Sequence, residues 1–403
     1  MGEIEGNIEL FSLLKPKKLN NDVDVLKLKE RTEYIFDTIL AHKLLYLHFW
    51  ALAHYSKGYV KTFAFVWHNR KKPYFYDKLA TSNNDGNTYA TSSKIRRKIS
   101  QNRFFHFLLV PALVKRLVDR QVTHMHAHFA DAASNFTLLA SLMSGIPYTF
   151  TAHAYDIFIE QDLMKEKIVY SCALITCTKF NKEFLLQKYP DLPAEKIYAI
   201  YHGLKWWEFS PPRNIVDKKP IIMTVGRLVQ KKGFDILIKA CGILKSQGVS
   251  FECWFVGDGP LREKLEAQVN QQNLKNNIKF WGLVPHSKIK DIYRQAKLFA
   301  LPCIVNEDGD RDGIPNVLLE AMAMEIPVVS THVSAIPELI EHGKTGFLVE
   351  SGDAAALATQ ISELLQNNKK YRKVCQAGRE KVQALFDPKT NVTELRDVIK
   401  EAV

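Results

Sequence analysis

The sequence predicts an α/β protein with two domains, each built on a parallel sheet that helices cover on both faces. Its 403 residues are more than one hydrophobic core usually organises. In both halves, short apolar runs alternate with longer segments of helical spacing, which is typical of parallel sheets. Residues 201–214 interrupt the alternation with a glycine, two prolines and two tryptophans. We therefore place the domain boundary near residues 204–218.

The second half shows the alternation most regularly, because glycine or proline bounds most of its apolar runs. Strands are expected at residues 220–225, 251–256, 278–281, 298–302, 326–330 and 346–349. Helices are expected between them, among others at 234–246, from the turn at 257–260 to about 271, and at 316–323. The loops that begin at Arg227, Gly257, Leu283 and Asp312 each follow a strand. Ligands of parallel sheets bind at the carboxyl ends of the strands, so these loops could share one site.

The first half alternates less regularly. Strands are expected at residues 8–13, 124–127, 148–151, 173–176 and 197–200. Helices are expected across 21–59 with a break allowed, and at 103–120, 131–144, 163–171 and 181–189. The predicted division is an N-terminal domain of residues 1–205, a C-terminal domain of 206–385, and a C-terminal helix at 386–403 that packs back on the N-terminal domain.

Composition limits the class of protein and its compartment. Hydrophobic content of 46% and charged content of 24% are those of an ordinary globular protein. The six cysteines are scattered without a Cys-x2-Cys pair, which indicates neither a zinc site nor a disulfide framework and favours the cytoplasm. We expect no signal peptide and no membrane-spanning segment. A net charge of +12 suggests anionic partners. The basic cluster at 94–98 lacks any RNA-binding signature, so we expect no nucleic-acid partner.

Asp312 and Glu320 form the most informative motif of the chain. Pro315 lies between them and prevents one uninterrupted helix, so Asp312 belongs to a loop and Glu320 to a helix that starts at Asn316. Free backbone N–H groups and a positive dipole end at this turn suit a phosphate. Two carboxylates beside a phosphate suit sugar hydroxyls. Residues 308–313 also match the opening of an EF-hand loop, but the twelfth position is leucine, which excludes that site.

The acidic pair resembles the E-x7-E motif of glycosyltransferase family 4, with aspartate in place of the first glutamate. Residues 226–233 resemble the GRL-x-x-KKG loop of the family, whose arginine and lysine hold the donor diphosphate. Residues 256–262 and 280–284 resemble the segments around the nucleotide base. The resemblance implies donor contacts from Arg227, Lys232, Gly257, Leu283, Val284, Gly313, Ile314, Val317 and Leu318.

Two histidine-containing loops in the first half also resemble the family. Residues 126–130 and 151–156 each stand just past a predicted strand. The resemblance implies that His153 reaches the donor sugar, so the catalytic set is His153, Asp312 and Glu320. His128 and Asp156 are expected on the acceptor side. The alternative is a metal cluster of His124, His126 and His128, which would share one face of a strand. Such a cluster needs a further ligand, and the sequence indicates none, so we expect no metal.

What the family resemblance implies is the GT-B arrangement, two Rossmann-like domains that face each other across a cleft. It implies a retaining hexosyltransferase that moves a sugar from a UDP- or GDP-linked donor to a saccharide or polyprenyl-linked acceptor. The nearest types are bacterial exopolysaccharide and colanic-acid glycosyltransferases, and no cofactor is implied. By comparison with the family, we expect its first βα unit to be missing before the strand at 8–13. A nucleotide-sugar epimerase and a catalytically dead nucleotide-binding homologue remain as rival hypotheses.

Residues 43–57 indicate a membrane surface as a further partner. They mix aromatic side chains with flanking lysines, and more basic residues follow at 61, 70–72 and 96–98. A basic, aromatic amphipathic helix can lie in a bilayer interface. We therefore expect a cytoplasmic protein that binds peripherally to the inner, anionic face of the membrane. The alternative is a buried helix with a solvated basic rim.

Overall fold

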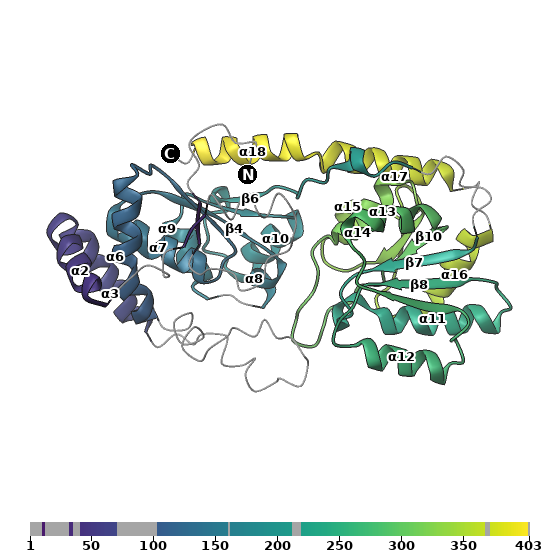
Figure 1. Ribbon diagram of the computed structural model, residues 1–403. Coiled ribbons are helices and arrows are strands. Elements are labelled where there is room, and N and C mark those ends of the chain that lie inside the picture. Colours follow the sequence, from purple (N-terminus) through teal and green to yellow (C-terminus); the bar gives the residue numbers. More distant parts are fainter. Residues whose placement is uncertain are drawn as a thin grey trace.

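The protein has two α/β halves, each with its own parallel sheet (Figure 1). The computed structural model describes residues 10–12, 32–34, 41–70, 103–159, 162–211, 219–366 and 371–401. The N-terminal sheet has the strand order β3-β4-β5-β6, and the C-terminal sheet has the order β12-β11-β10-β7-β8-β9. All pairs in both sheets are parallel, so the predicted α/β class with two parallel sheets is confirmed.

In the N-terminal half, helices cover a sheet whose two central strands, β4 and β5, are buried on both faces. The strands are β3 (Met125–His128), β4 (Tyr148–Ala152), β5 (Ala173–Thr176) and β6 (Ile197–Ala199). The helices are α2 (Ala41–His54), α3 (Ser56–Asn69), α6 (Arg103–Asp119), α7 (Ala132–Ser144), α8 (Ala154–Phe158), α9 (Met164–Tyr170), α10 (Lys179–Lys188) and the short η2 (Ala194–Lys196). All five residues of β4 are buried, as expected of a central parallel strand.

The predicted helical region at 21–59 was wrong over part of its length. Residues 32–34 form the strand β2 (Thr32–Tyr34), which pairs in parallel with β1 (Leu10–Ser12). Threonine and tyrosine fit a pleated strand better than a helix, so local preference agrees with the structure. The helical part begins at Ala41, breaks at Tyr55 and continues to Asn69. Residues 13–31 and 35–40 lie outside the described part of the chain.

The C-terminal half follows the predicted order of strands and helices closely. Its strands are β7 (Ile221–Val225), β8 (Glu252–Val256), β9 (Ile278–Gly282), β10 (Leu298–Ala300), β11 (Val328–Thr331) and β12 (Phe347–Val349). Its helices are η3 (Trp206–Glu208), η4 (Gln230–Lys232), α11 (Phe234–Ser246), α12 (Arg262–Gln271), α13 (His286–Gln295), α14 (Asn316–Ala323), α15 (Ile336–Leu339), α16 (Ala354–Gln366) and α17 (Arg372–Leu385). Helix α18 (Pro388–Glu401) ends the described chain.

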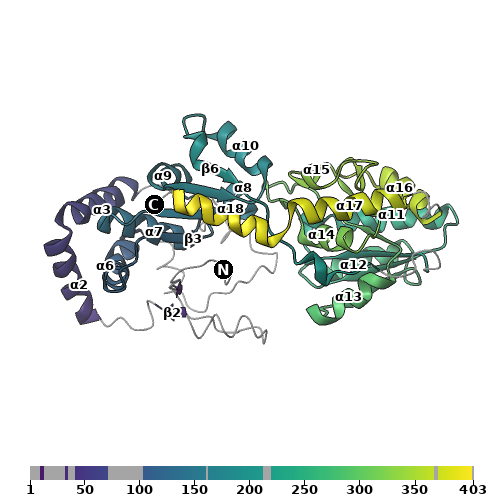
Figure 2. The same ribbon diagram turned by 90° about the horizontal axis from the view of Figure 1, so that it is seen from above.

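The last helix returns to the N-terminal half. Figures 1 and 2 show α18 in yellow, lying along the N-terminal half after α17 has packed on the C-terminal one. Val398 of α18 joins a small buried cluster with Ile175 and Ile200. At the crossing, the Leu204 amide donates to the Phe386 carbonyl at 2.8 Å. Apolar contacts and backbone hydrogen bonds therefore connect the two halves on this side.

Glu338 of α15 makes a second connection, beside the strand ends. Its carboxylate accepts hydrogen bonds from the backbone amides of Lys179 and Phe180, at 3.0 and 2.7 Å, and from the Tyr201 hydroxyl at 2.7 Å. A carboxylate at the N-terminus of α10 is stabilised by the helix dipole. This contact holds the carboxyl ends of β5 and β6 toward the C-terminal half.

Candidate active site

Three strand-end loops of the C-terminal sheet meet backbone to backbone. Gly226 follows β7, Gly257 follows β8 and Gly282 ends β9. The Gly226 amide donates to Val256 at 3.0 Å, and the Gly257 amide donates to Gly282 at 2.9 Å. A β-carbon at position 257 would lie 2.0 Å from the Gly226 carbonyl oxygen, and the φ angle of 131° also excludes most side chains. Glycine at 257 therefore lets the Gly226 loop lie against its neighbour.

Lys232 and Asp312, predicted for the diphosphate and the sugar, form an ion pair. Lys232 Nζ lies 2.8 Å from Asp312 Oδ2, and the two side chains are 14% and 17% exposed. Burial alone would lower the pKa of Lys232, but the attraction of Asp312 outweighs it and the net pKa is raised. The lysine is therefore charged throughout the neutral range. Because β7 and β10 are neighbours in the sheet, the loops that carry these two residues start side by side.

A second pair beside the first was missed by the sequence analysis. Lys231 Nζ lies 3.0 Å from Asp310 Oδ1 and 3.7 Å from Asp312 Oδ1. The sequence alone assigns Asp310 no partner, because an aspartate in a polar loop is common. The sequence does contain a signal for this pair. Lys231 and Lys232 are adjacent in one strand-end loop, and Asp310 and Asp312 are two positions apart in another.

Helix α14 begins at Asn316, at the predicted residue, and carries Glu320 one turn inside. The hydroxyl of the fully buried Tyr293 donates to Glu320 Oε2 at 2.9 Å. Burial and the neighbouring carboxylate raise the pKa of Tyr293 well above its usual value, so it stays a donor. The amide of Leu318 donates to the Pro315 carbonyl at 3.0 Å and its side chain is fully buried. The donor contact of Leu318 stays a prediction, and the amides of residues 316 and 317 also lie in the first turn of the helix.

The other predicted donor residues differ in exposure. Arg227 is exposed at the loop after β7, and the Leu283 side chain is 82% exposed. Val284, Ile314 and Val317 are partly buried against the C-terminal core. The predicted donor contacts therefore include one exposed charged side chain, one exposed apolar side chain and three partly buried apolar ones.

Asp156 holds two loops of the N-terminal half together. Its Oδ2 accepts from the amides of His153 at 2.9 Å and Ala130 at 3.1 Å, and the residue is 2% exposed. Burial raises the pKa of Asp156 to about 6 against the two hydrogen bonds and the charge of Lys167, which lower it. The predicted acceptor contact stays a prediction, and the buried carboxyl favours a positioning role for this residue.

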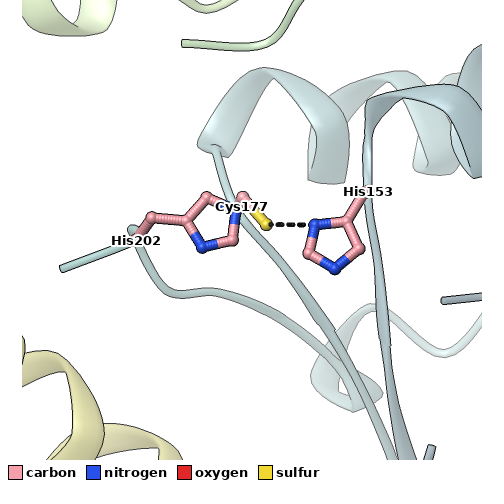
Figure 3. A group of neighbouring side chains, drawn as sticks. All are labelled: His153, Cys177 and His202. Carbon is pink, nitrogen blue, oxygen red and sulfur yellow. Dashed lines mark hydrogen bonds between the residues drawn. The ribbon is translucent and has the colours of Figure 1, made fainter. Parts of the chain in front are cut away.

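His153 stands at the end of β4 among other rings and a thiol. Its ring lies 5.3 Å from that of His202 and 6.4 Å from that of His128, measured between centroids. Its Nδ1 lies 3.4 Å from Cys177 Sγ (Figure 3). Burial, then His202 and His128, lower the pKa of His153 to about 4. The imidazole is therefore neutral at pH 7 and can donate or accept at a sugar hydroxyl.

Cys177 and His202 were missed by the sequence analysis. Cys177 directly follows β5, and His202 lies three residues past β6. The strand-end position that singled out His153 applied to both of them. The alternative cluster on β3 is instead held by threonines: His126 lies 2.8 and 3.0 Å from the hydroxyls of Thr149 and Thr151.

The acidic loop of the C-terminal half lies against the N-terminal strand ends. A β-carbon at Gly313 would lie 3.7 Å from the Thr178 methyl group, next in sequence to Cys177. The Arg311 guanidinium lies 4.7 Å from the centre of the Phe158 ring. Asp312 and the group around His153 therefore belong to facing surfaces, although no direct contact between them is seen in the described residues.

Similar proteins identify the family. The chain is 33% identical over 303 residues to the amylovoran biosynthesis glycosyltransferase AmsK of Erwinia amylovora, covering 73% of this chain and 74% of that protein. It is 38% identical over 210 residues to the putative colanic acid biosynthesis glycosyltransferase WcaL of Escherichia coli K12, covering 52% of each. Residues 206–381 match the family described as Glycosyl transferases group 1.

Solved structures agree on the fold. A glycosyltransferase from Rickettsia africae superposes with a TM-score of 0.64 at 19% identity, covering 77% of this chain and 88% of that one. Anabaena Alr3699/HepE, solved with UDP and glucose, gives 0.61 at 20% identity, covering 73% and 81%. The GT-B fold predicted from the sequence is confirmed. Because AmsK is 33% identical to this chain over about three quarters of both proteins, and residues 206–381 match the family, the chain belongs to the group 1 glycosyltransferases.

Proposed function

We propose that this glycosyltransferase moves a sugar, with retention of its anomeric configuration, from a UDP- or GDP-linked donor to a saccharide or lipid-linked acceptor. The observation that carries the proposal is the Lys232–Asp312 ion pair, which joins the loop between β7 and α11 to the loop before α14. Helix α14 carries Glu320, which the Tyr293 hydroxyl holds in place. The names of the similar proteins support exopolysaccharide synthesis as the pathway, and one structural neighbour was solved with UDP and glucose.

The donor diphosphate would replace the Asp312 carboxylate as the ionic partner of Lys232. An incoming phosphate is a stronger partner for Lys232 than a single carboxylate, and Arg227 can grip two of its oxygens. Asp312 is then released to accept hydrogen bonds from the transferred sugar, while Glu320 binds the ribose hydroxyls. The cations stabilise the charge that develops on the leaving diphosphate.

The acceptor would enter on the side of the N-terminal sheet. The neutral His153 can hydrogen-bond a sugar hydroxyl without placing a second charge near the donor. The family resemblance implies that the acceptor attacks on the face from which the diphosphate leaves, and that the diphosphate helps to remove the acceptor proton. Closing the two halves would exclude water and limit hydrolysis of the donor.

The decisive experiment compares donor alone with donor plus acceptor. The protein is incubated with UDP- and GDP-sugars, with and without a saccharide or polyprenyl-phosphate-linked acceptor, and early products are followed by NMR. We expect an acceptor-dependent product with the donor's anomeric configuration. Conversion of the donor without an acceptor would favour an epimerase. Nucleotide binding without any product would favour a catalytically dead homologue. A product with inverted anomeric configuration would exclude retention.

We propose further that the α2–α3 pair binds the surface of an anionic membrane. Leu45, Tyr46 and Phe49 of α2 are 64–71% exposed, and Trp67 of α3 is 51% exposed. These helices lie at the end of the N-terminal half that faces away from the C-terminal half (Figure 2). None of the described helices combines the length and apolar character needed to cross a bilayer. The predicted basic residues at 71–72 and 96–98 lie outside the described part of the chain.

Vesicle co-sedimentation tests the membrane surface. Each lysine or arginine near an anionic leaflet contributes about 1 kcal/mol, and the exposed rings add apolar contact. We expect pelleting with phosphatidylserine vesicles at low salt, weakened by high salt and by the double substitution Tyr46→Ser with Phe49→Ser. Trp207→Ser is the matched control, because this ring is also exposed, at 45%, but belongs to η3 and not to α2 or α3. Equal pelleting of both variants, or none of the unmodified protein at low salt, would exclude this surface.

A further inference from the structure

Three side chains of the N-terminal half bring nitrogen and sulfur atoms together at neighbouring strand ends. His153, Cys177 and His202 stand past β4, β5 and β6, which pair in that order. One potential ligand atom from each lies within 4.8 Å of the other two. Figure 3 shows the Cys177 sulfur between the two imidazole rings. The sheet register fixes the three backbones, so the cluster does not depend on a long loop.

We propose that His153, Cys177 and His202 form a site for Zn²⁺, with water as the fourth ligand. Imidazole nitrogen and thiolate sulfur are both ligands that Zn²⁺ takes, and three protein ligands leave one tetrahedral position open. With Zn–S near 2.3 Å and Zn–N near 2.0–2.1 Å, a tetrahedral ion separates sulfur from nitrogen by roughly 3.6 Å. The distance between Cys177 Sγ and His153 Nδ1 is 3.4 Å. His202 is exposed, so its ring can rotate to bring its nitrogen from within 4.8 Å to coordination distance.

Protonation favours metal binding at the imidazole of His153 and opposes it at the thiol of Cys177. Zn²⁺ binds neutral imidazoles, and the ring of the half-buried His153 is neutral at pH 7. Burial, and then the Asp156 carboxylate, raise the pKa of Cys177 to about 12. The thiol is therefore protonated without an ion; Zn²⁺ displaces this proton to solvent and bonds the thiolate, as coordinating cysteines do. Asp156 adds a nearby negative group, and its bond to the His153 amide holds one ligand in place.

Zinc would regulate the transfer reaction. This consequence rests on the proposed function, because it needs His153 to contact the donor sugar. A bound ion occupies that imidazole and blocks the sugar, while the cations at Lys232 and Arg227 stay open to phosphate. Zn²⁺ should therefore compete with the sugar nucleotide but leave binding of bare UDP or GDP unchanged.

Cobalt spectroscopy tests the site without any need for activity. Co²⁺ added to the metal-free protein should give a thiolate-to-cobalt charge-transfer band at one ion per chain, and Zn²⁺ should abolish it by displacement. Cys177→Ser should remove the band, and His202→Ala should weaken Zn²⁺ affinity at least 10- to 100-fold, the loss typical even of outer-sphere substitutions. Cys172→Ser, at the other cysteine of intermediate burial, is the matched control.

The outcomes separate the site from the function. Absence of the band in the unmodified protein, or a band that survives Cys177→Ser, would overturn the metal site. His202→Ala changes an exposed residue, so a folded variant with unchanged affinity would overturn it as well. If zinc binds through these residues but an active enzyme is not inhibited, the regulatory consequence is wrong. If no donor is turned over, the spectroscopic result still decides the site while the proposed function fails.

Discussion

The strand-end loops of the two sheets differ in charge. At the C-terminal sheet, two lysines and two aspartates pair within 3.7 Å in half-buried positions. At the N-terminal sheet, the polar groups are imidazoles with lowered pKa values, about 4 for His153 and about 3 for His126. At pH 7 the first surface therefore presents ionised side chains, whereas the imidazoles of the second are neutral.

This difference indicates which part of a sugar nucleotide each surface suits. A diphosphate needs cations, and Lys232 is a cation whose present partner can be exchanged. Sugar hydroxyls need donors and acceptors but no net charge, which neutral imidazoles supply. The comparison predicts that substitutions in the two halves will separate binding of the nucleotide from transfer of the sugar.

The largest expected effect is that of Lys232→Ala. Losing the cation beside the leaving diphosphate should lower kcat/KM by roughly 100- to 1,000-fold, as for other groups that stabilise transition-state charge. Lys231→Ala is the matched control, because it changes the adjacent lysine, whose shorter contact is with Asp310. Steady-state kinetics with the donor varied should show a much smaller loss for the control. Equal losses would contradict a specific role for Lys232.

The next effect divides the two carboxylates. Glu320→Gln should weaken binding of bare UDP or GDP by about 1.5–3 kcal/mol, the worth of hydrogen bonds to a charged group. Asp312→Asn should not weaken it, because removing this charge frees Lys232 for phosphate; its loss should appear only in turnover of the sugar nucleotide. Calorimetry with bare nucleotide measures both variants. Equal weakening by the two would refute this division of roles.

The sequence predicted the order of elements better than the contacts of side chains. Strands such as β7 and β8 follow from apolar runs bounded by glycine or proline, and the start of α14 follows from Pro315, because these signals are local. Cys177 lies 24 residues from His153, and their contact exists only through the register of β4 with β5. The Tyr293–Glu320 hydrogen bond likewise joins two helices, α13 and α14. The apolar periodicity of each helix does not specify how the two pack against each other.

A smaller effect is expected from Tyr293→Phe. The hydroxyl of Tyr293 fixes Glu320 and also lies 3.3 Å from the Val317 carbonyl. Its removal should weaken nucleotide binding by about 1 kcal/mol, roughly fivefold, because Glu320 keeps its charge and loses only its orientation. Tyr371→Phe, at another buried tyrosine of this half, is the control. Nucleotide affinity unchanged by Tyr293→Phe would show that the orientation of Glu320 does not matter.

The smallest expected effect concerns acid stability of the N-terminal half. Burial, with His128 and His124, lowers the pKa of His126 from 6.5 to about 3. The unfolded chain therefore binds a proton at this residue that the folded chain rejects, so its contribution to stability is complete above pH 6.5 and is lost as the pH falls toward 3. Asp156 acts in the opposite direction, since its pKa is raised from 3.8 to about 6 and its folded carboxyl holds a proton that the unfolded one releases.

Because these two contributions overlap, the test is a difference between variants. His126→Gln keeps a polar side chain between Thr149 and Thr151 but removes the titration. Urea midpoints of the N-terminal transition, measured from pH 7 to pH 4, should fall less steeply for this variant than for the unmodified protein. His54→Gln, at an exposed histidine of α2, is the matched control and should keep the original slope. If His126→Gln also keeps that slope, the neutral imidazole does not distinguish this half from the charged loops of the other.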